Sequence, residues 1–171
     1  MTKAFRFAVC ALVLAGAFSA FSLGRAETVV VLVRHGEKVD ESRDADLSAT
    51  GRARAQALAA MLKEAGIGAV YSTDYIRTRE TARPTAELAS KPIEVYDGDG
   101  LAAFAKNLRS RGGRVLVVGH SDTTPELVSL LGGEPGPPIA SDEYDRLYIL
   151  TLSADGKTST TLLRFPSGVA K

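Results

Sequence analysis

The segment Thr28–Val33 reads Thr-Val-Val-Val-Leu-Val, so every position after Thr28 is apolar and most are β-branched. A strand with one face in water alternates apolar and polar residues, whereas a strand covered on both faces does not. The segment Arg114–Val118 has the same character. Two such strands predict a parallel sheet with helices on both faces, which limits the fold to the layered α/β class.

A first helix is expected after the first strand. Ser48 or Thr50 can cap its N-terminus, and Gly66 can end it after about Ala65. Spacings of three and four predict one buried face that contains Leu58, Met61, Leu62 and Ala65.

The rest of the chain alternates in the same way. Helices are expected over 74–88, with Pro84 as a kink or restart, over 101–109, and from Thr124, with Pro125 as the first helical residue. Strands are expected over 69–72, 92–96, 147–152 and 160–165, the last two joined through Asp155-Gly156. This order predicts a three-layer α/β/α sandwich with a mostly parallel sheet and one antiparallel strand.

The first 26 residues have the parts of a bacterial signal peptide. Two basic residues precede the apolar stretch 7–21, and small residues flank the candidate cleavage sites Ala26 and Ala20. The stretch is short for a transmembrane helix, so we expect cleavage rather than an uncleaved anchor or a buried helix. The chain is then a signal peptide, 1–26, and one domain, 27–171, exported to the periplasm or beyond.

Composition excludes several classes of partner. The formal net charge is +1, which does not indicate a surface for nucleic acid or for an acidic membrane. After the N-terminus no stretch is long and apolar enough to span a bilayer. Signal cleavage would remove the only cysteine, Cys10, so the mature protein would have neither a disulfide nor a thiol nucleophile.

Both histidines of the chain, His35 and His120, follow a strongly apolar strand. Ligands of open α/β sheets bind at the carboxyl ends of the strands, so the two side chains are expected to meet in one site. A single histidine in such a place could be structural, but two placed alike favour a site. The loops 38–46 and 134–145 are expected to line its mouth.

Two arginines are expected at the same edge. Arg34 follows the first strand, and Arg77 lies in the first turn of the second helix. A guanidinium binds phosphate through two parallel hydrogen bonds, and the helix that starts at Thr124 would point its positive end toward the same place. Arg79 and Arg83 are expected to be solvated. These groups predict a pocket for a phosphate dianion.

Three segments resemble, in order, the motifs of the histidine phosphatase superfamily, also called phosphoglycerate-mutase-like. They are Leu32-Val-Arg-His-Gly-Glu37, Tyr71-Ser-Thr-Asp-Tyr-Ile-Arg-Thr-Arg-Glu-Thr-Ala82 and Val117-Val-Gly-His-Ser121. The resemblance extends over residues 27–165. Because the chain is too short for an inserted cap domain, it is most similar to the small phosphohistidine-phosphatase-like members.

The resemblance implies a function and a role for each residue. His35 would attack phosphorus and carry the phosphoryl group, while Arg34, Arg77 and His120 would bind its oxygens. No metal or other cofactor would be needed, and two histidines without a third ligand also make a poor zinc site. The expected substrate is a small phosphorylated compound or a phosphohistidine.

No motif identifies the general acid that would protonate the leaving group. Glu37 resembles a structural position of the family, and the other candidates are Asp97, Asp99 and Asp122. We prefer Asp99, although it could instead cap the helix from Leu101. A good leaving group needs no acid. The missing motif leaves two alternatives open: a catalytically weak phosphate-binding module, and a phosphoryl mutase, which would require insertions that this short chain lacks.

Overall fold

The computed structural model describes residues 27–167, so the predicted signal peptide lies outside the described residues. The strands are β1 (Thr28–Arg34), β2 (Ala69–Ser72), β3 (Ile93–Val95), β4 (Gly113–Gly119), β5 (Arg146–Leu152) and β6 (Thr158–Arg164). The helices are α1 (Ala49–Leu62), α2 (Ile76–Leu88), α3 (Leu101–Arg111) and α4 (Thr123–Leu130).

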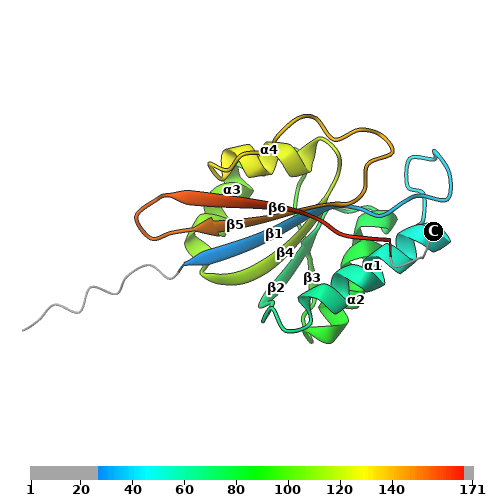
Figure 1. Ribbon diagram of the computed structural model, residues 1–171, viewed down its shortest axis with the longest axis horizontal. Coiled ribbons are helices and arrows are strands. Elements are labelled where there is room, and N and C mark those ends of the chain that lie inside the picture. The colour runs from blue at the N-terminus through cyan, green and yellow to red at the C-terminus, as the bar shows by residue number, and fades with distance from the viewer. Residues whose placement is uncertain (1–26, 168–171) are drawn as a thin grey trace, which may run out of the picture.

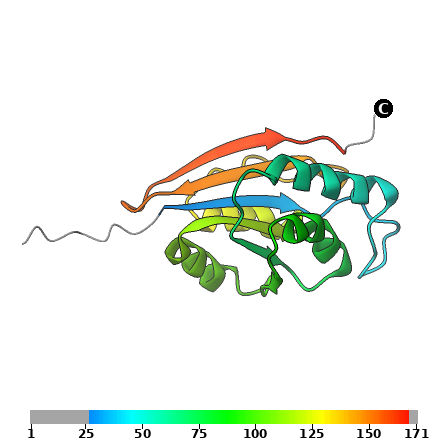
Figure 2. The same cartoon turned by 90° about the horizontal axis from the view of Figure 1, so that it is seen from below.

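The strands form one sheet in the order β3-β2-β4-β1-β5-β6 (Figure 1). β1, β2, β3 and β4 pair in parallel, whereas β5 pairs antiparallel with both β1 and β6. One strand therefore runs against the others, as Figure 2 shows from below. This confirms the predicted sheet, and it places the carboxyl ends of β1, β2 and β4 at one edge.

Helices cover both faces of the sheet. Val30 and Leu32 of β1 belong to a cluster with side chains of α3 and α4, and Val31 and Val33 belong to a second cluster with side chains of α1 and α2. Figure 1 shows the two pairs of helices on opposite sides of the strands. The uninterrupted apolar run of β1 is thus explained, because neither of its faces meets water.

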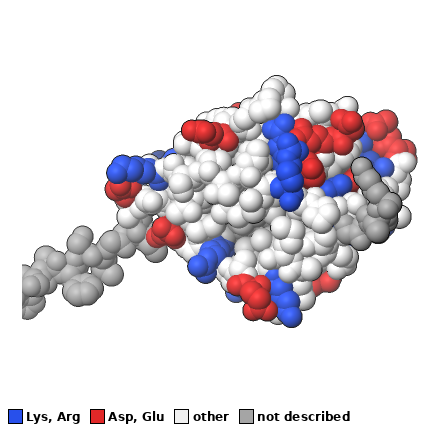
Figure 3. All heavy atoms as spheres, viewed as in Figure 1, with Lys and Arg blue, Asp and Glu red and all other residues white. Residues whose placement is uncertain are grey.

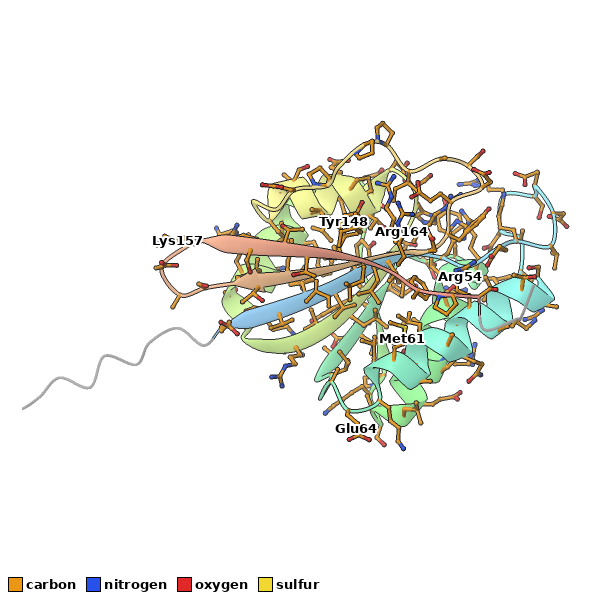
Figure 4. All side chains as sticks on the ribbon, viewed as in Figure 1. Arg54, Met61, Glu64, Tyr148, Lys157 and Arg164 are labelled. Carbon is orange, nitrogen blue, oxygen red and sulfur yellow. The ribbon has the colours of Figure 1, made fainter. Side chains whose placement is uncertain are left out.

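Two local expectations are wrong, and one of the two alternatives for Pro84 is excluded. Met61 is 47% exposed, because the buried stripe of α1 runs through Ala55, Leu58 and Leu62 (Figure 4). α2 continues through Pro84 as one helix, so it does not restart there. The cap of α4 is Asp122 rather than Thr124, because the Asp122 side chain already accepts a hydrogen bond from the N–H of Thr123, at 2.7 Å.

The surface has no region dominated by one charge on the face drawn in Figure 3, where acidic and basic side chains are interspersed. Of the helices in residues 27–167, none has the length and apolar character to cross a bilayer.

Candidate active site

A cavity of about 1120 Å³ lies at the predicted edge of the sheet. Its lining includes Arg34, His35, Arg77 and His120, so the structure brings together four of the residues that the sequence singled out. The loop 38–46 contributes to the wall, as expected. The loop 134–145 does not line the cavity; it contacts Arg34 from outside, as described below.

His35 is fixed by the backbone around it. Its backbone N–H donates to the carbonyl oxygen of Gly119 on β4, at 2.9 Å, and the residue is 4% exposed. The ring Nδ1 lies 2.7 Å from the carbonyl oxygen of Gly36, which can only accept, so Nδ1 carries the proton. The N–H of Gly36 in turn donates to Thr81 Oγ1, at 2.9 Å. Nε2 of a neutral His35 therefore has the free lone pair that a nucleophile needs.

Burial lowers the pKa of His35 from 6.5 to about 3. The hydrogen bond to Gly36 opposes this shift, whereas the positive charges of Arg34 and Arg77 add to it. The imidazole is therefore neutral near pH 7.

His120 faces His35 across the site, with the ring centroids 5.4 Å apart. Its Nε2 lies 2.8 Å from Thr73 Oγ1, and its Nδ1 lies 3.4 Å from Nη2 of Arg77. A guanidinium only donates, so Nδ1 accepts and Nε2 carries the proton. Burial, followed by the charge of Arg77, lowers the pKa of His120 to about 4, while Asp122 acts in the opposite direction.

Both arginines have a donor without a partner. Arg34 Nη1 donates to the carbonyl oxygens of Ala140 and Glu143, at 2.8 Å each, and Arg77 Nη1 donates to the carbonyl oxygen of Arg43, at 2.8 Å. Nε of each arginine is buried and has no hydrogen-bond partner among the described residues. An unpaired buried donor lowers the stability of a protein. Two such donors, in side chains that line one cavity, suggest that the cavity binds an anionic ligand.

Two tyrosines that the sequence analysis did not single out stack on the arginines, and of the two only Tyr75 lines the cavity. Tyr144 stacks on the guanidinium of Arg34, at 4.1 Å from the ring centroid, and Tyr75 stacks in the same way on Arg77, at 4.4 Å. Tyr75 also meets His120 edge-on, at 5.1 Å. Tyr75 lies inside the second family-like motif, but no pattern in the sequence distinguishes Tyr144.

The N-terminus of α4 contributes less to an anion site than the sequence suggested. Asp122 places a carboxylate there, and the N–H of Thr124 already donates to the carbonyl oxygen of His120, at 3.1 Å. The N–H of His120 donates to Thr123 Oγ1, at 2.9 Å. These bonds hold the loop that carries His120.

The candidate acids differ in their surroundings. Glu37 is paired with Arg54 at 2.6 Å, as a structural residue would be. Asp97, Asp99 and Asp122 line the cavity. Asp99 does not cap α3, whose N-cap is Gly100 without a side-chain bond, so the alternative role for Asp99 is wrong. Its role as the acid stays a prediction.

Metal-ligating side chains do not gather in the described part of the chain: no group of three or more His, Cys, Asp or Glu residues there could hold a metal ion.

These features define a class of protein. It is a phosphoglycerate-mutase-like α/β/α sandwich that has two histidines and two arginines at the carboxyl edge of its sheet. Residues 30–102 match the family model described as "Histidine phosphatase superfamily (branch 1)". The match contains the first two of the three motifs, and it confirms the resemblance to this family. None of the curated proteins matches the chain in sequence.

Solved structures of this family have the same fold. The protein histidine phosphatase SixA complexed with tungstate superposes with a TM-score of 0.64 at 22% identity, over 81% of this chain and 97% of that one. A putative phosphohistidine phosphatase SixA from Nakamurella multipartitia gives 0.63 at 20% identity, over 82% and 97%. Phosphoserine phosphatase from Entamoeba histolytica, in complex with 3-phosphoglyceric acid, gives 0.59 at 16% identity, over 83% and 100%.

These superpositions establish the fold, and the family match over residues 30–102 supports phosphatase activity.

Proposed function

We propose that the protein is a metal-independent phosphatase that forms a phosphohistidine intermediate on His35. The observation that carries the proposal is the hydrogen bond from Nδ1 of His35 to the carbonyl oxygen of Gly36, because it leaves Nε2 unprotonated in a cavity that Arg34 and Arg77 also line.

The reaction has two displacements. In the first, Nε2 of His35 attacks phosphorus, the bond from phosphorus to the leaving group breaks, and the leaving group takes the electron pair. In the second, water attacks phosphorus, the P–N bond breaks, and its electron pair returns to Nε2. Inorganic phosphate is then released.

The surrounding cations stabilise the charge on the transferring phosphoryl oxygens. Arg34 and Arg77 both line the cavity, and their guanidinium groups can donate to these oxygens. The lowered pKa of His120 favours the neutral ring near pH 7, but a dianion beside it would raise this pKa and favour the protonated ring, which can donate from Nδ1 as well.

The substrate would be a small phosphorylated compound or a phosphohistidine. The structural neighbours include a protein histidine phosphatase, a glucosyl-3-phosphoglycerate phosphatase and a phosphoserine phosphatase, so the shared fold favours no single substrate. The cavity of about 1120 Å³ admits a substrate larger than inorganic phosphate.

We also place the mature protein in the periplasm or outside the cell, on the basis of residues 1–26.

The test uses residues 27–171 with p-nitrophenyl phosphate and a phosphorus-labelled substrate. Wild-type protein should release p-nitrophenol, and an alkaline detergent quench should trap label on the chain, since the P–N bond is lost in acid. His35→Ala should reduce turnover by several orders of magnitude and abolish the trapped label. Phosphate binding without turnover in the wild type would instead indicate a binding module, and phosphoryl transfer to an added acceptor would indicate a mutase.

A further inference from the structure

The segment 132–145 between α4 and β5 has no helix or strand, yet five of its carbonyl groups accept side-chain hydrogen bonds. Tyr148 Oη donates to Pro135 at 2.7 Å, and Arg146 donates to Pro137 at 2.6 Å and to Pro138 at 3.2 Å. Ala140 and Glu143 accept from Arg34. Figure 1 shows this segment arching from α4 to β5, and Figure 4 marks Tyr148 beneath it. The donors from β1 and β5 therefore determine the shape of the segment.

Arg146 is the centre of this arrangement. The residue is 4% exposed, and its guanidinium holds the Glu143 carboxylate from Nε at 2.6 Å and from Nη2 at 2.7 Å. Besides its bonds to the two proline carbonyls, Nη1 donates to Tyr148 Oη at 3.0 Å. All five N–H groups of Arg146 thus have an acceptor, so that none is left for a ligand.

Glu143 connects Arg146 to the active site. Its Oε2 accepts from the N–H of Ala140 at 3.2 Å, and its own N–H donates to the carbonyl oxygen of Ala140 at 3.1 Å. The hydrogen bond from Arg146 keeps the pKa of Glu143 at about 2, so the carboxylate is charged at neutral pH. Ala140 and Glu143 are also the two residues whose carbonyl oxygens hold Arg34.

The same turn supplies Tyr144, whose ring covers the Arg34 guanidinium. Arg34 is therefore held through Nη1 and across one face by a turn that the Arg146–Glu143 pair closes, and its side chain lines the cavity. We propose that Arg146 and Glu143 are positioning residues: they hold the turn 140–144 so that Arg34 presents its free N–H groups to the phosphoryl group. The inference rests on the proposed function, since it assigns Arg34 a phosphoryl ligand.

The test is a double-mutant cycle between Glu143→Gln and Arg34→Ala, measured by kcat/KM and by the inhibition constant of inorganic phosphate. Glu143→Gln removes the charge but keeps the size of the side chain. We expect it to reduce phosphate affinity and kcat/KM about tenfold each, because Arg34 would be displaced from the phosphoryl group. In the Arg34→Ala background, Glu143→Gln should then have almost no further effect, because the residue through which it acts is absent.

Two more variants separate this role from general stability. Arg146→Lys keeps the charge but loses the paired donors, so it should follow Glu143→Gln. Arg164→Met is the control: Arg164 also bonds the Glu143 carboxylate, but from the exposed side, and its loss should leave phosphate affinity within twofold.

Additive effects of Glu143→Gln and Arg34→Ala on both readouts would overturn the inference, even if all variants melt as the wild type does. A wild-type protein that binds no phosphate would contradict the proposed function itself. An active wild-type protein whose two substitutions have additive effects would contradict only the positioning role.

Discussion

The Nδ1 atom of His35 and the carbonyl oxygen of Gly36 are 2.7 Å apart. The backbone of the residue after the proposed nucleophile thus selects the tautomer of His35, and no carboxylate of the described residues takes part. The N–H of Gly36 is held by Thr81 of α2, at 2.9 Å. The reactivity of His35 therefore depends on the conformation of one short loop and on the helices that pack against it.

The two buried histidines should make stability depend on pH. Their pKa values are about 3 and about 4, against 6.5 in an unfolded chain, so the unfolded state binds more protons between these values. Above about pH 6.5 the two histidines should not lower the free energy of unfolding. As the pH decreases toward 4, this free energy should fall by up to about 1.4 kcal/mol per pH unit for each histidine.

Urea unfolding at several pH values checks this expectation. His35→Gln cannot titrate, so it should show a shallower decrease between pH 6.5 and 4.5 than the wild type. Equal slopes in the two proteins would mean that His35 is not held neutral by the fold.

Arg77 should contribute to transition-state binding. Arg77→Ala should lower kcat/KM about a hundredfold or more, which corresponds to about 2.7 kcal/mol, because it removes a donor to the transferring phosphoryl group. Arg77→Lys should restore only part of the activity, since an ammonium cannot form two parallel hydrogen bonds.

Arg83→Ala is the matched control on the same helix. Arg83 is exposed and pairs with Glu80, and neither residue lines the cavity. Its loss should change stability by less than about 0.5 kcal/mol and leave kcat/KM unaltered. Similar kinetics for the Arg77 and Arg83 variants would remove Arg77 from the site.

The order of the elements and the placement of His35 and His120 could be predicted from the sequence for one physical reason. Continuous apolar strands must be covered on both faces, and parallel strands bring their carboxyl ends to one edge. These constraints depend on the type of each residue and its spacing along the chain, which the sequence displays directly.

The partners of Arg34 could not be predicted in this way. Tyr144, Ala140 and Glu143 reach Arg34 across more than a hundred residues of sequence, and they do so through the folding of a segment without periodicity. Two of these contacts use backbone carbonyls, which every residue has. Similarly, Asp122 and Thr124 are both good capping residues, and only the conformation of the loop decides between them.

Asp99 should be needed only for poor leaving groups. Asp99→Asn should lower kcat on an alkyl phosphate at least about tenfold, and leave kcat on p-nitrophenyl phosphate nearly unaltered, because p-nitrophenolate leaves without a proton. Asp122→Asn is the comparison, measured together with its melting temperature because Asp122 caps α4. A selective loss in Asp122→Asn, with Asp99→Asn unaltered, would move the acid to Asp122.

Export should remove the N-terminal segment. When the full chain is expressed in a bacterium, mass spectrometry of the periplasmic or secreted fraction should find a protein that begins near Glu27. A full-length product that still carries Lys3 and stays in the cytoplasm would contradict the assignment of residues 1–26.

Gly51 on α1 lies against the loop that follows His35, the proposed nucleophile. A Cβ at position 51 would lie 2.3 Å from the carbonyl oxygen of Glu37, and a Cβ at position 36 would lie 2.9 Å from Gly51 Cα. Neither glycine has a positive φ, so the backbone conformation does not require glycine at these positions. The short distances do, because a side chain would have no space there. The close approach of α1 to the loop thus depends on the absence of two side chains.

Replacing a glycine inside a helix with alanine normally stabilises a protein, by about 1 kcal/mol. Gly51→Ala should do the opposite and destabilise by about 1–3 kcal/mol, because the new methyl group must push α1 away from backbone that cannot rotate aside. The same displacement moves Gly36, so kcat/KM should fall as well. Thr50→Ala, at an exposed position of the same helix, should leave both quantities nearly unaltered. Urea unfolding and kinetics of the two variants decide the matter: if Gly51→Ala is as stable and as active as Thr50→Ala, the packing of α1 does not control the loop that orients His35.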